Sequence, residues 1–249
     1  MTLRPIPVSK AMIRRREAVL SLPVWDEVKE VVDLGCGHGV VSNLLVPRGL
    51  RVIGVDRHPV AAFGFQGKLV LGEAETVDLP SGSADLVLAL ELIEHLPTRA
   101  AVDQVIANMK RITRQWMLIT VPHDEQLENN QRPCPACGRA FHVYHHFQRF
   151  TPEELRKIVD WPVAACQIIP FPESGRTPRW LVKMRNSVGL WPRKLDQTCA
   201  FCGAAAPPDP SSISKKILQF PVRVLGRLIM PWLKPNGWIL ALFEKPGSA

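Results

Sequence analysis

The feature that most constrains this chain is a short apolar run followed by three closely spaced glycines. Residues 30–34 read Glu-Val-Val-Asp-Leu, and Gly35, Gly37 and Gly39 lie in the loop that follows. A short, nearly continuous apolar run is typical of a strand buried on both faces of a parallel sheet. Glycines let the backbone adopt positive φ and approach a ligand closely. The pattern therefore predicts a ligand site at the carboxyl edge of a parallel sheet.

Strand-like and helix-like segments alternate along much of the chain. Helices are expected at 9–22, 40–46 and 98–112, and another begins at Thr151, where an N-cap residue precedes Pro and two Glu. Strands are expected at 30–34, 51–56, 68–72, 84–90, 115–121, 163–169 and 238–244. This alternation predicts an α/β fold with a doubly wound, seven-stranded, mostly parallel sheet.

Two segments interrupt the alternation. The first is rich in His and Cys, and the second contains nine prolines. The expected organisation is a core at 1–122, a first insertion at 123–150, a core helix and strand at 151–171, a second insertion at 172–237, and a last core strand with its tail at 238–249.

The positive charge of the chain is concentrated in the second insertion. Residues 172–237 hold eleven Lys or Arg against three Asp or Glu, so their net charge equals the +8 of the whole chain. Such a segment attracts phosphate groups, whether on nucleic acid, on a nucleotide-linked substrate or on an anionic membrane. A solvated basic surface is the alternative interpretation.

Further acidic residues stand where the next predicted strands end. Asp56 follows the glycine loop by seventeen residues, and a carboxylate there can accept both hydroxyls of a ribose. Glu73 ends the third strand, and Glu91-Leu-Ile-Glu-His-Leu96 follows the fourth. The Gly-x-Gly-x-x-Gly pattern of dinucleotide sites is absent, because position 40 is Val, and so is the lysine of a P-loop.

Together these residues resemble the class I S-adenosylmethionine (SAM)-dependent methyltransferases, in particular the group with Glu-His-Leu after the fourth strand. The resemblance covers residues 10–122 and implies a Rossmann-like fold that binds SAM. It places Asp33, Gly35, Cys36, Gly37, Gly39, Leu90 and Glu91 around the methionine part, Asp56 and Arg57 at the ribose, and Glu73 and Ala74 beside the adenine. Position 73 is commonly Asp in this group, and Glu is longer by one methylene.

Two Cys-x-x-Cys-Gly units have the form of zinc knuckles. This spacing lets both thiolates of a pair face one tetrahedral ion, and the glycine permits the tight turn. We expect Cys134, Cys137, Cys199 and Cys202 to hold one structural Zn²⁺ that joins the two insertions. One alternative site uses Cys134, Cys137, His142 and either His145 or His146; a redox pair or unbound thiols are the others.

Three histidines follow the first knuckle, in Phe141-His-Val-Tyr-His-His-Phe147. The segment resembles a Cys-Pro-x-Cys-Gly-x-x-Phe-His pattern in bacterial methyltransferases of the same group, which supports the metal. If the ion takes four sulfurs, then His142, His145 and His146 become candidates for a general base with a pKa near neutrality. Surface or core packing is the alternative for each of them.

Residues 213–233 mix apolar and basic side chains. Ile213, Ile217, Leu225, Leu228 and Trp232 can share one helical face, with Lys216, Arg223, Arg227 and Lys234 on another. Pro221 and Pro231 are expected to break the segment into short helices. Within 213–234 the pattern suits contact with an anionic membrane, or a lid packed over the active site.

The leading functional prediction is methylation of a small molecule, with a hydroxyl on a saccharide, lipid-linked glycan or secondary metabolite as acceptor. The alternatives are an RNA methyltransferase and a non-catalytic, SAM-binding partner protein. An Asn-Pro-Pro-Tyr motif of amine methylation is absent, since Thr120-Val-Pro-His123 stands in its place. Charged residues at 14–17 occupy the position of a signal's apolar region, so we expect a cytoplasmic protein, or one on the cytoplasmic face of a membrane.

Overall fold

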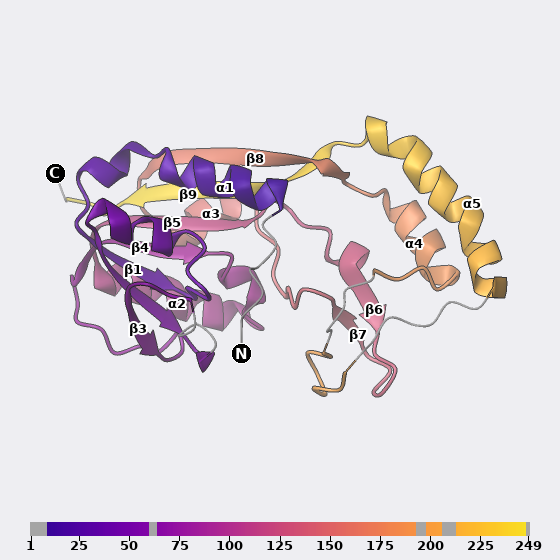
Figure 1. The fold of residues 1–249 in the computed structure, drawn as a ribbon, viewed down its shortest axis with the longest axis horizontal. Coiled ribbons are helices and arrows are strands. Elements are labelled where there is room, and N and C mark those ends of the chain that lie inside the picture. Colours follow the sequence, from indigo (N-terminus) through magenta and orange to yellow (C-terminus); the bar gives the residue numbers. More distant parts are fainter. Residues whose placement is uncertain (1–8, 60–63, 193–197, 206–212, 248–249) are drawn as a thin grey trace. The chain divides into compact units, whose positions relative to one another are not determined.

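A computed structural model describes residues 9–59, 64–192, 198–205 and 213–247 (Figure 1). The chain forms two compact units. Unit 1 comprises Met1–His123, Phe150–Pro170 and Gly237–Ala249, and unit 2 comprises Asp124–Arg149 and Phe171–Asn236. Each unit is therefore assembled from segments that are distant in the sequence.

Unit 1 is built on the seven-stranded sheet that the sequence predicts. Its strand order is β3-β2-β1-β4-β5-β9-β8, and the strands from β3 to β5 pair in parallel while β9 runs antiparallel to β5. The strands are β1 (Glu30–Leu34), β2 (Arg51–Asp56), β3 (Lys68–Leu71), β4 (Ala84–Leu90), β5 (Thr113–Pro122), β8 (Val163–Gly175) and β9 (Pro235–Glu244). The last residues of β8 and the first two of β9 belong to unit 2.

The helices of unit 1 begin at well-capped residues. They are α1 (Lys10–Leu20), α2 (Arg99–Ile112) and α3 (Pro152–Val159). Ser9 and Thr98 accept backbone N–H groups at the first turns of α1 and α2. Thr151 and Glu154 form a reciprocal capping box at the start of α3, as the Thr-Pro-Glu-Glu pattern indicates.

The two faces of the sheet are both covered, and successive residues of β4 show how. Leu86 and Leu88 are buried in a cluster with Val19 of α1, whereas Val87 and Ala89 are buried in a second cluster with residues of α2 and α3. Side chains of a strand alternate between faces, so a continuous apolar run serves both clusters at once.

The helix expected at 40–46 does not form. The chain instead makes two short 3₁₀ segments, η2 (Ser42–Leu44) and η3 (Val46–Arg48). Asn43 explains part of the difference, because its side chain donates to the carbonyls of His38 and Gly64 and accepts the N–H of Gln66. Pro47 removes a backbone donor in the next turn, so a regular helix is not continued.

Unit 2 contains a short two-stranded sheet and two helices within the described residues. Its elements are η6 (Leu127–Asn130), β6 (Gln131–Pro133), β7 (Ala140–His142), α4 (Arg179–Ser187), α5 (Ile213–Ile229) and η7 (Met230–Trp232). Strands β6 and β7 pair antiparallel on either side of the first cysteine knuckle. Helices α4 and α5 contact each other.

The prediction that Pro221 breaks the basic segment is wrong, because α5 continues through it. Proline leaves the carbonyl four residues earlier without its helical donor, and that residue, Ile217, is on the exposed side of α5, where water can serve it. The predicted apolar face is also exposed at Ile217, Leu228 and Trp232, while Gln219 and Val222 are buried. In the described ranges, no helix combines the length and apolar character needed to cross a bilayer.

Candidate functional site

The glycine loop after β1 has a backbone that side chains would obstruct. Gly35, Gly37 and Gly39 adopt φ of 70°, 51° and 73°. A Cβ at Gly35 would lie 2.7 Å from Leu92 Cδ1, and one at Gly39 would lie 2.5 Å from Asn43 Oδ1. A Cβ at Gly37 would meet nothing within 4 Å, so there the backbone borders open space. The loop is therefore tight at its two ends and accessible at its centre.

Asp33 is buried at the start of this loop. Its side chain accepts a hydrogen bond from Ser42 Oγ at Oδ2, while Oδ1 has no hydrogen-bond partner among the described residues. Burial raises the pKa of Asp33 to about 7. A buried acceptor without a donor is costly, so this oxygen fits a ligand that brings an N–H or ammonium group. The methionine part of SAM carries such a group.

Asp56, at the end of β2, ties the glycine loop to the neighbouring strand. Its carboxylate accepts the N–H of Gly37 at Oδ2 and the N–H of His58 at Oδ1, both at 2.8 Å. Each carboxylate oxygen can accept a second hydrogen bond, so the group retains capacity for ribose hydroxyls. Parallel pairing of β1 and β2 places Asp33 opposite Gly54, which brings both acids to the same sheet edge.

The adenine-side candidates lie after β3. Glu73 is exposed and 4.0 Å from the guanidinium of Arg57. Ala74 is buried, and its carbonyl accepts a hydrogen bond from Asn108 of α2. The backbone at Ala74 is therefore fixed by its hydrogen bond with Asn108 of α2. The Arg57–Glu73 ion pair is exposed to solvent and contributes little stability.

Glu91 directly follows β4 and has a φ of 58°, which is unusual for a residue other than glycine. Its carboxylate is engaged on several sides: Arg15 lies 2.7 Å away, Trp238 Nε1 donates at 2.6 Å and Thr120 Oγ1 donates at 3.3 Å. The Arg15 guanidinium also stacks over the Trp238 ring. Leu90, beside Glu91, is half-buried.

Sequence reasoning did not identify Arg15, Trp238 and Thr120 as neighbours of Glu91. They come from α1, β9 and β5, and no local pattern links positions so far apart.

Cys36 is largely buried in the glycine loop, and burial raises the pKa of its thiol, so it remains protonated. Cys36 therefore fills space beside the loop rather than serving as a nucleophile.

The four knuckle cysteines come together in unit 2. Their sulfur atoms all lie within 4.8 Å of one another. Cys134 Sγ is 3.7 Å from Cys202 Sγ, and Cys137 Sγ is 3.8 Å from Cys199 Sγ. These distances are too long for disulfides. A tetrahedral zinc with Zn–S bonds of about 2.3 Å separates its sulfurs by about 3.8 Å, so the cluster fits the ion.

Both knuckles have the same backbone. Gly138 and Gly203 adopt φ of 72° and 68°, and their N–H groups donate to the carbonyls of Cys134 and Cys199. Each first cysteine also donates its own N–H to a carbonyl just beyond the knuckle. The glycine in each Cys-x-x-Cys-Gly unit thus permits the positive φ that closes the turn.

The electrostatics of the cluster also favour a cation. The N–H groups of Cys137 and Ala136 lower the pKa of Cys134 to about 6. For Cys202 the N–H of Ala204 acts in the same direction, but partial desolvation and the adjacent sulfurs outweigh it and raise the pKa to about 11. Ionisation of one thiol therefore disfavours ionisation of its neighbours, and a bound divalent cation would offset this repulsion between thiolates.

The histidines form a second cluster in unit 2, centred on Glu125, which sequence reasoning did not identify. Glu125 Oε2 lies 2.5 Å from His146 Nδ1, and Oε1 lies 3.2 Å from His142 Nε2. Burial raises the pKa of Glu125, but the hydrogen bonds with His142 and His146 outweigh it and hold the pKa well below its usual range. The only sequence signal is an acid shortly after the fifth predicted strand.

The three histidines have different environments. His142 is buried, and its Nδ1 accepts the N–H groups of Tyr144 and His146, while burial lowers its pKa. His145 Nε2 lies 2.8 Å from the Thr198 carbonyl, to which it donates, next to the second knuckle. The rings of His142 and His146 stack 4.7 Å apart and nearly parallel, so their in-plane lone pairs do not converge on one ion.

Comparison with known proteins places the core of the chain in one family. A family model described as a methyltransferase domain matches residues 9–160. The ubiquinone biosynthesis O-methyltransferase of Idiomarina loihiensis is 28% identical over 155 residues, which cover 53% of this chain and 60% of that protein. The enzyme of the same name from Pseudomonas aeruginosa strain UCBPP-PA14 is 29% identical over 104 residues, or 37% and 44% of the two chains. The chain thus spans about half the length of these relatives.

Solved structures show the same fold at low sequence identity. A SAM-dependent methyltransferase from Archaeoglobus fulgidus is 17% identical, with a TM-score of 0.55 over 95% of each chain. The N-methyltransferase NodS of Bradyrhizobium japonicum is 12% identical, with a TM-score of 0.55 over 97% of this chain and 99% of that one. At this level of identity the likeness concerns the fold.

Proposed function

We propose that this chain, which belongs to the methyltransferase domain family, transfers the methyl group of SAM to a hydroxyl oxygen of a small molecule. Two considerations support oxygen as the acceptor atom. The curated relatives are named as O-methyltransferases, although they match only part of this chain. A hydroxyl must also lose its proton as it attacks, and a histidine oriented by a carboxylate, as His146 is by Glu125, is suited to accept that proton.

The observation that carries the proposal is the pairing of Glu125 with His146. Because Glu125 is a carboxylate that only accepts, His146 Nδ1 carries the proton of their 2.5 Å hydrogen bond. In the neutral form of His146 with its proton on Nδ1, the lone pair is on Nε2, as a general base requires. Glu125 acts as a positioning residue, which holds the ring and its tautomer.

The other two histidines suit this role less well. His142 accepts two backbone N–H groups at Nδ1, so its remaining proton is on Nε2 and faces Glu125. His145 uses Nε2 to donate to the Thr198 carbonyl. Of the three histidines, His146 has the shortest contact with a carboxylate, 2.5 Å to Glu125, and we assign the base to it.

The sheet edge supplies the cofactor contacts in this proposal. SAM provides an electrophilic methyl group on a sulfonium, and the chain binds and orients it. Asp33 Oδ1 would accept the ammonium of the methionine part, the Gly35–Gly39 loop would border it, and Asp56 would accept the ribose hydroxyls. The proposed site is completed by Arg57, Glu73, Ala74, Leu90 and Glu91. The Glu91 carboxylate holds Arg15 and Trp238 in place.

We further propose that the cysteine cluster holds a structural Zn²⁺. Four thiolates close the coordination shell and leave no position for a water or substrate, so the ion would carry no step of the reaction. The metal would join segments 124–149 and 171–236, since each contributes one knuckle.

The proposed function is tested by the transfer of labelled methyl from SAM to phenols, catechols and sugar hydroxyls, with matched amines as controls. Once an acceptor is found, His146→Ala should lower kcat by about 10²–10⁴-fold. Glu125→Gln should lower kcat less and leave the Kd for SAM unchanged, because Glu125 acts through His146. Glu128→Gln, which neutralises an exposed acid three residues further along the chain, is the matched control and should retain full activity.

Three results would contradict the proposal. Label on amines but not on hydroxyls would show that oxygen is not the acceptor. Full activity of His146→Ala would exclude His146 as the general base. Label in nuclease-sensitive material of a fractionated lysate would favour the RNA alternative, with the basic segment as its substrate contact.

A further inference from the structure

Helix α5 has two faces with different surroundings in unit 2. One face is anchored: Gln219 is buried and donates to the carbonyls of Val188 and Gly189 just beyond α4. Val222 is also buried, and Gly226 faces Leu181 of α4, whose Cδ2 would be 3.9 Å from an added Cβ. The helix is therefore held on one side.

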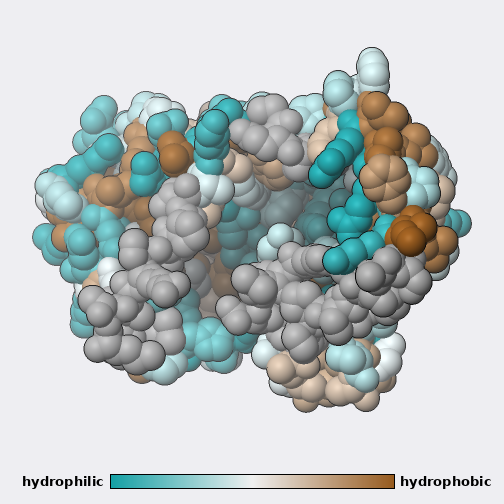
Figure 2. Space-filling view, turned by 45° about the vertical axis from the view of Figure 1, so that its right-hand side comes forward, coloured by the Kyte–Doolittle hydropathy of each residue, from teal (hydrophilic) through white to brown (hydrophobic). Residues whose placement is uncertain are grey.

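The opposite face of α5 is an exposed apolar stripe, which we define as Ile217, Phe220, Val224 and Leu228. Their spacing of three or four residues places them on one side of the helix. Ile217, Phe220 and Leu228 are each more than 60% exposed, and Trp232, in η7 just beyond α5, is 81% exposed. Figure 2 shows brown apolar side chains of α5 at the surface, next to teal hydrophilic ones. Large apolar side chains gathered in this way are typical of a contact surface.

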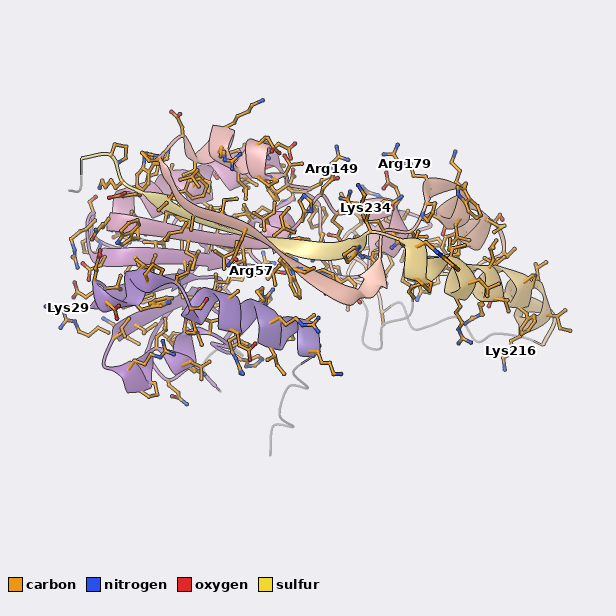
Figure 3. The ribbon with its side chains drawn as sticks, turned by 90° about the horizontal axis from the view of Figure 1, so that it is seen from above. Lys29, Arg57, Arg149, Arg179, Lys216 and Lys234 are labelled. Carbon is orange, nitrogen blue, oxygen red and sulfur yellow. The ribbon has the colours of Figure 1, made fainter. Side chains whose placement is uncertain are left out.

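Basic side chains flank one side of the stripe. Lys216, Arg223 and Arg227 are exposed and recur at helical spacing, and Lys234 follows η7. Figure 3 labels Lys216 and Lys234 near opposite ends of this segment. The sequence contains no Asp or Glu from 210 to 243, so no acidic side chain within the segment neutralises this charge.

We propose that the α5 stripe, with Trp232, inserts into the surface of an anionic lipid membrane while the basic flank binds lipid headgroups. An interfacial helix lies in the membrane plane with its apolar face buried about 5–10 Å deep. Tryptophan is favoured at the same depth, where its ring meets the headgroups. The inference is independent of which acceptor is methylated.

The chemistry of the face favours a membrane over other occupants. A second copy of the same face would bring its like charges together, at an electrostatic cost. RNA would meet the basic residues and could stack on Phe220, but it would leave aliphatic Ile217 and Leu228 in water. A bilayer with anionic headgroups complements both the aliphatic stripe and the charge.

The test is flotation of the full chain with phosphatidylcholine vesicles that contain or lack phosphatidylglycerol. We expect binding to the anionic vesicles, weakened by salt, and little binding to neutral ones. Lys216→Gln and Arg227→Gln should each weaken partitioning about fivefold. Phe220→Ser and Leu228→Ser should each reduce vesicle binding at least tenfold, because the native side chains at these positions would be buried in the membrane.

Matched controls are an exposed apolar and an exposed basic residue of unit 1, Leu71→Ser and Lys157→Gln, which should bind as the native chain does. The proposal is overturned if the native chain does not float, or if neutral vesicles bind it equally well. Equal losses in the controls, or concentration-dependent dimerisation abolished by Phe220→Ser, would also overturn it. Binding of comparable strength to RNA but not to vesicles would assign the face to nucleic acid instead.

Discussion

The two units of this protein are stabilised in different ways. In unit 1, apolar side chains cover both faces of the sheet, and two large clusters hold most of the buried residues. In unit 2, the buried cluster at the knuckles comprises Cys134, Phe141 and Cys199 within the described residues. A three-residue cluster contributes little hydrophobic stabilisation, so metal coordination is what we expect to hold these segments together.

Polar contacts in unit 2 point the same way. Arg176 pairs with Asp124 at 2.6 Å, and Arg185 donates to the side chain and carbonyl of Asn129. Each of these contacts links segment 124–149 to segment 171–236. Such contacts specify geometry but contribute modestly to stability, since the partners keep partial access to water. Unit 1 should therefore tolerate loss of metal, and unit 2 should not.

The largest effect is expected from the metal site. Cys199→Ser should release the zinc and unfold unit 2, because structural zinc contributes about 10–16 kcal/mol to the folding of small sites. Bound zinc and protease cleavage within 124–149 and 171–236 measure this, with unit 1 remaining resistant. Cys166→Ala, a thiol of β8 outside the cluster, is the control. Zinc retained in Cys199→Ser but lost in His142→Ala would establish the mixed Cys/His site instead.

A cavity in the sheet should destabilise unit 1 and leave the zinc site of unit 2 unaffected. Leu86→Ala removes a fully buried side chain from β4 and should lower the free energy of unfolding of unit 1 by about 2–5 kcal/mol. Denaturant unfolding measures the loss, and zinc content should be unchanged. Loss of zinc in this variant would show that the two units unfold together, which would break the comparison.

Asp33 should make unit 1 sensitive to pH at its ligand site. The unfolded carboxyl has a pKa near 3.9, and the folded one has a pKa of about 7. As pH rises between these values, the unfolded state ionises first, so the free energy of unfolding falls, and above pH 7 it levels off. Asp33→Asn removes this loss and should stabilise the SAM-free protein above pH 7 by up to about 4 kcal/mol.

The same substitution should abolish SAM binding, because an amide cannot neutralise the ammonium of the cofactor. Thermal unfolding at several pH values, together with SAM titration, measures both effects. Parallel pH profiles for Asp33→Asn and the native chain would contradict the burial argument. Tight SAM binding by the variant would contradict the proposed role of Asp33.

The smallest expected effect concerns a helix cap in unit 1. Thr151→Ala removes both the acceptor for Glu154 N–H and one half of the capping box at α3. The free energy of unfolding of unit 1 should fall by about 1 kcal/mol. Thr151→Ser retains the hydroxyl and should keep most of the stability that Thr151→Ala loses. A larger loss would show that α3 matters more to the sheet than its length indicates.

The sequence by itself determined the fold of unit 1 and the residue types of its site. Strand positions followed from apolar runs such as 84–90, which coincide with β4 because burial on both faces leaves a local signature. The helix start at Thr151 followed from capping chemistry, which acts within four residues. The two Cys-x-x-Cys-Gly turns also form as expected, because each knuckle is closed by its own glycine.

Only the tertiary structure decided what depends on residues distant in the chain. The contacts of Glu91 with Arg15 and Trp238, and of Glu125 with His146, join elements that no local pattern relates. The sequence also left open which side of α5 is buried: Gln219 lies on the buried side, where its side chain donates to the Val188 and Gly189 carbonyls. Periodicity shows that a helix is amphipathic, but the neighbour against which it packs selects the buried side.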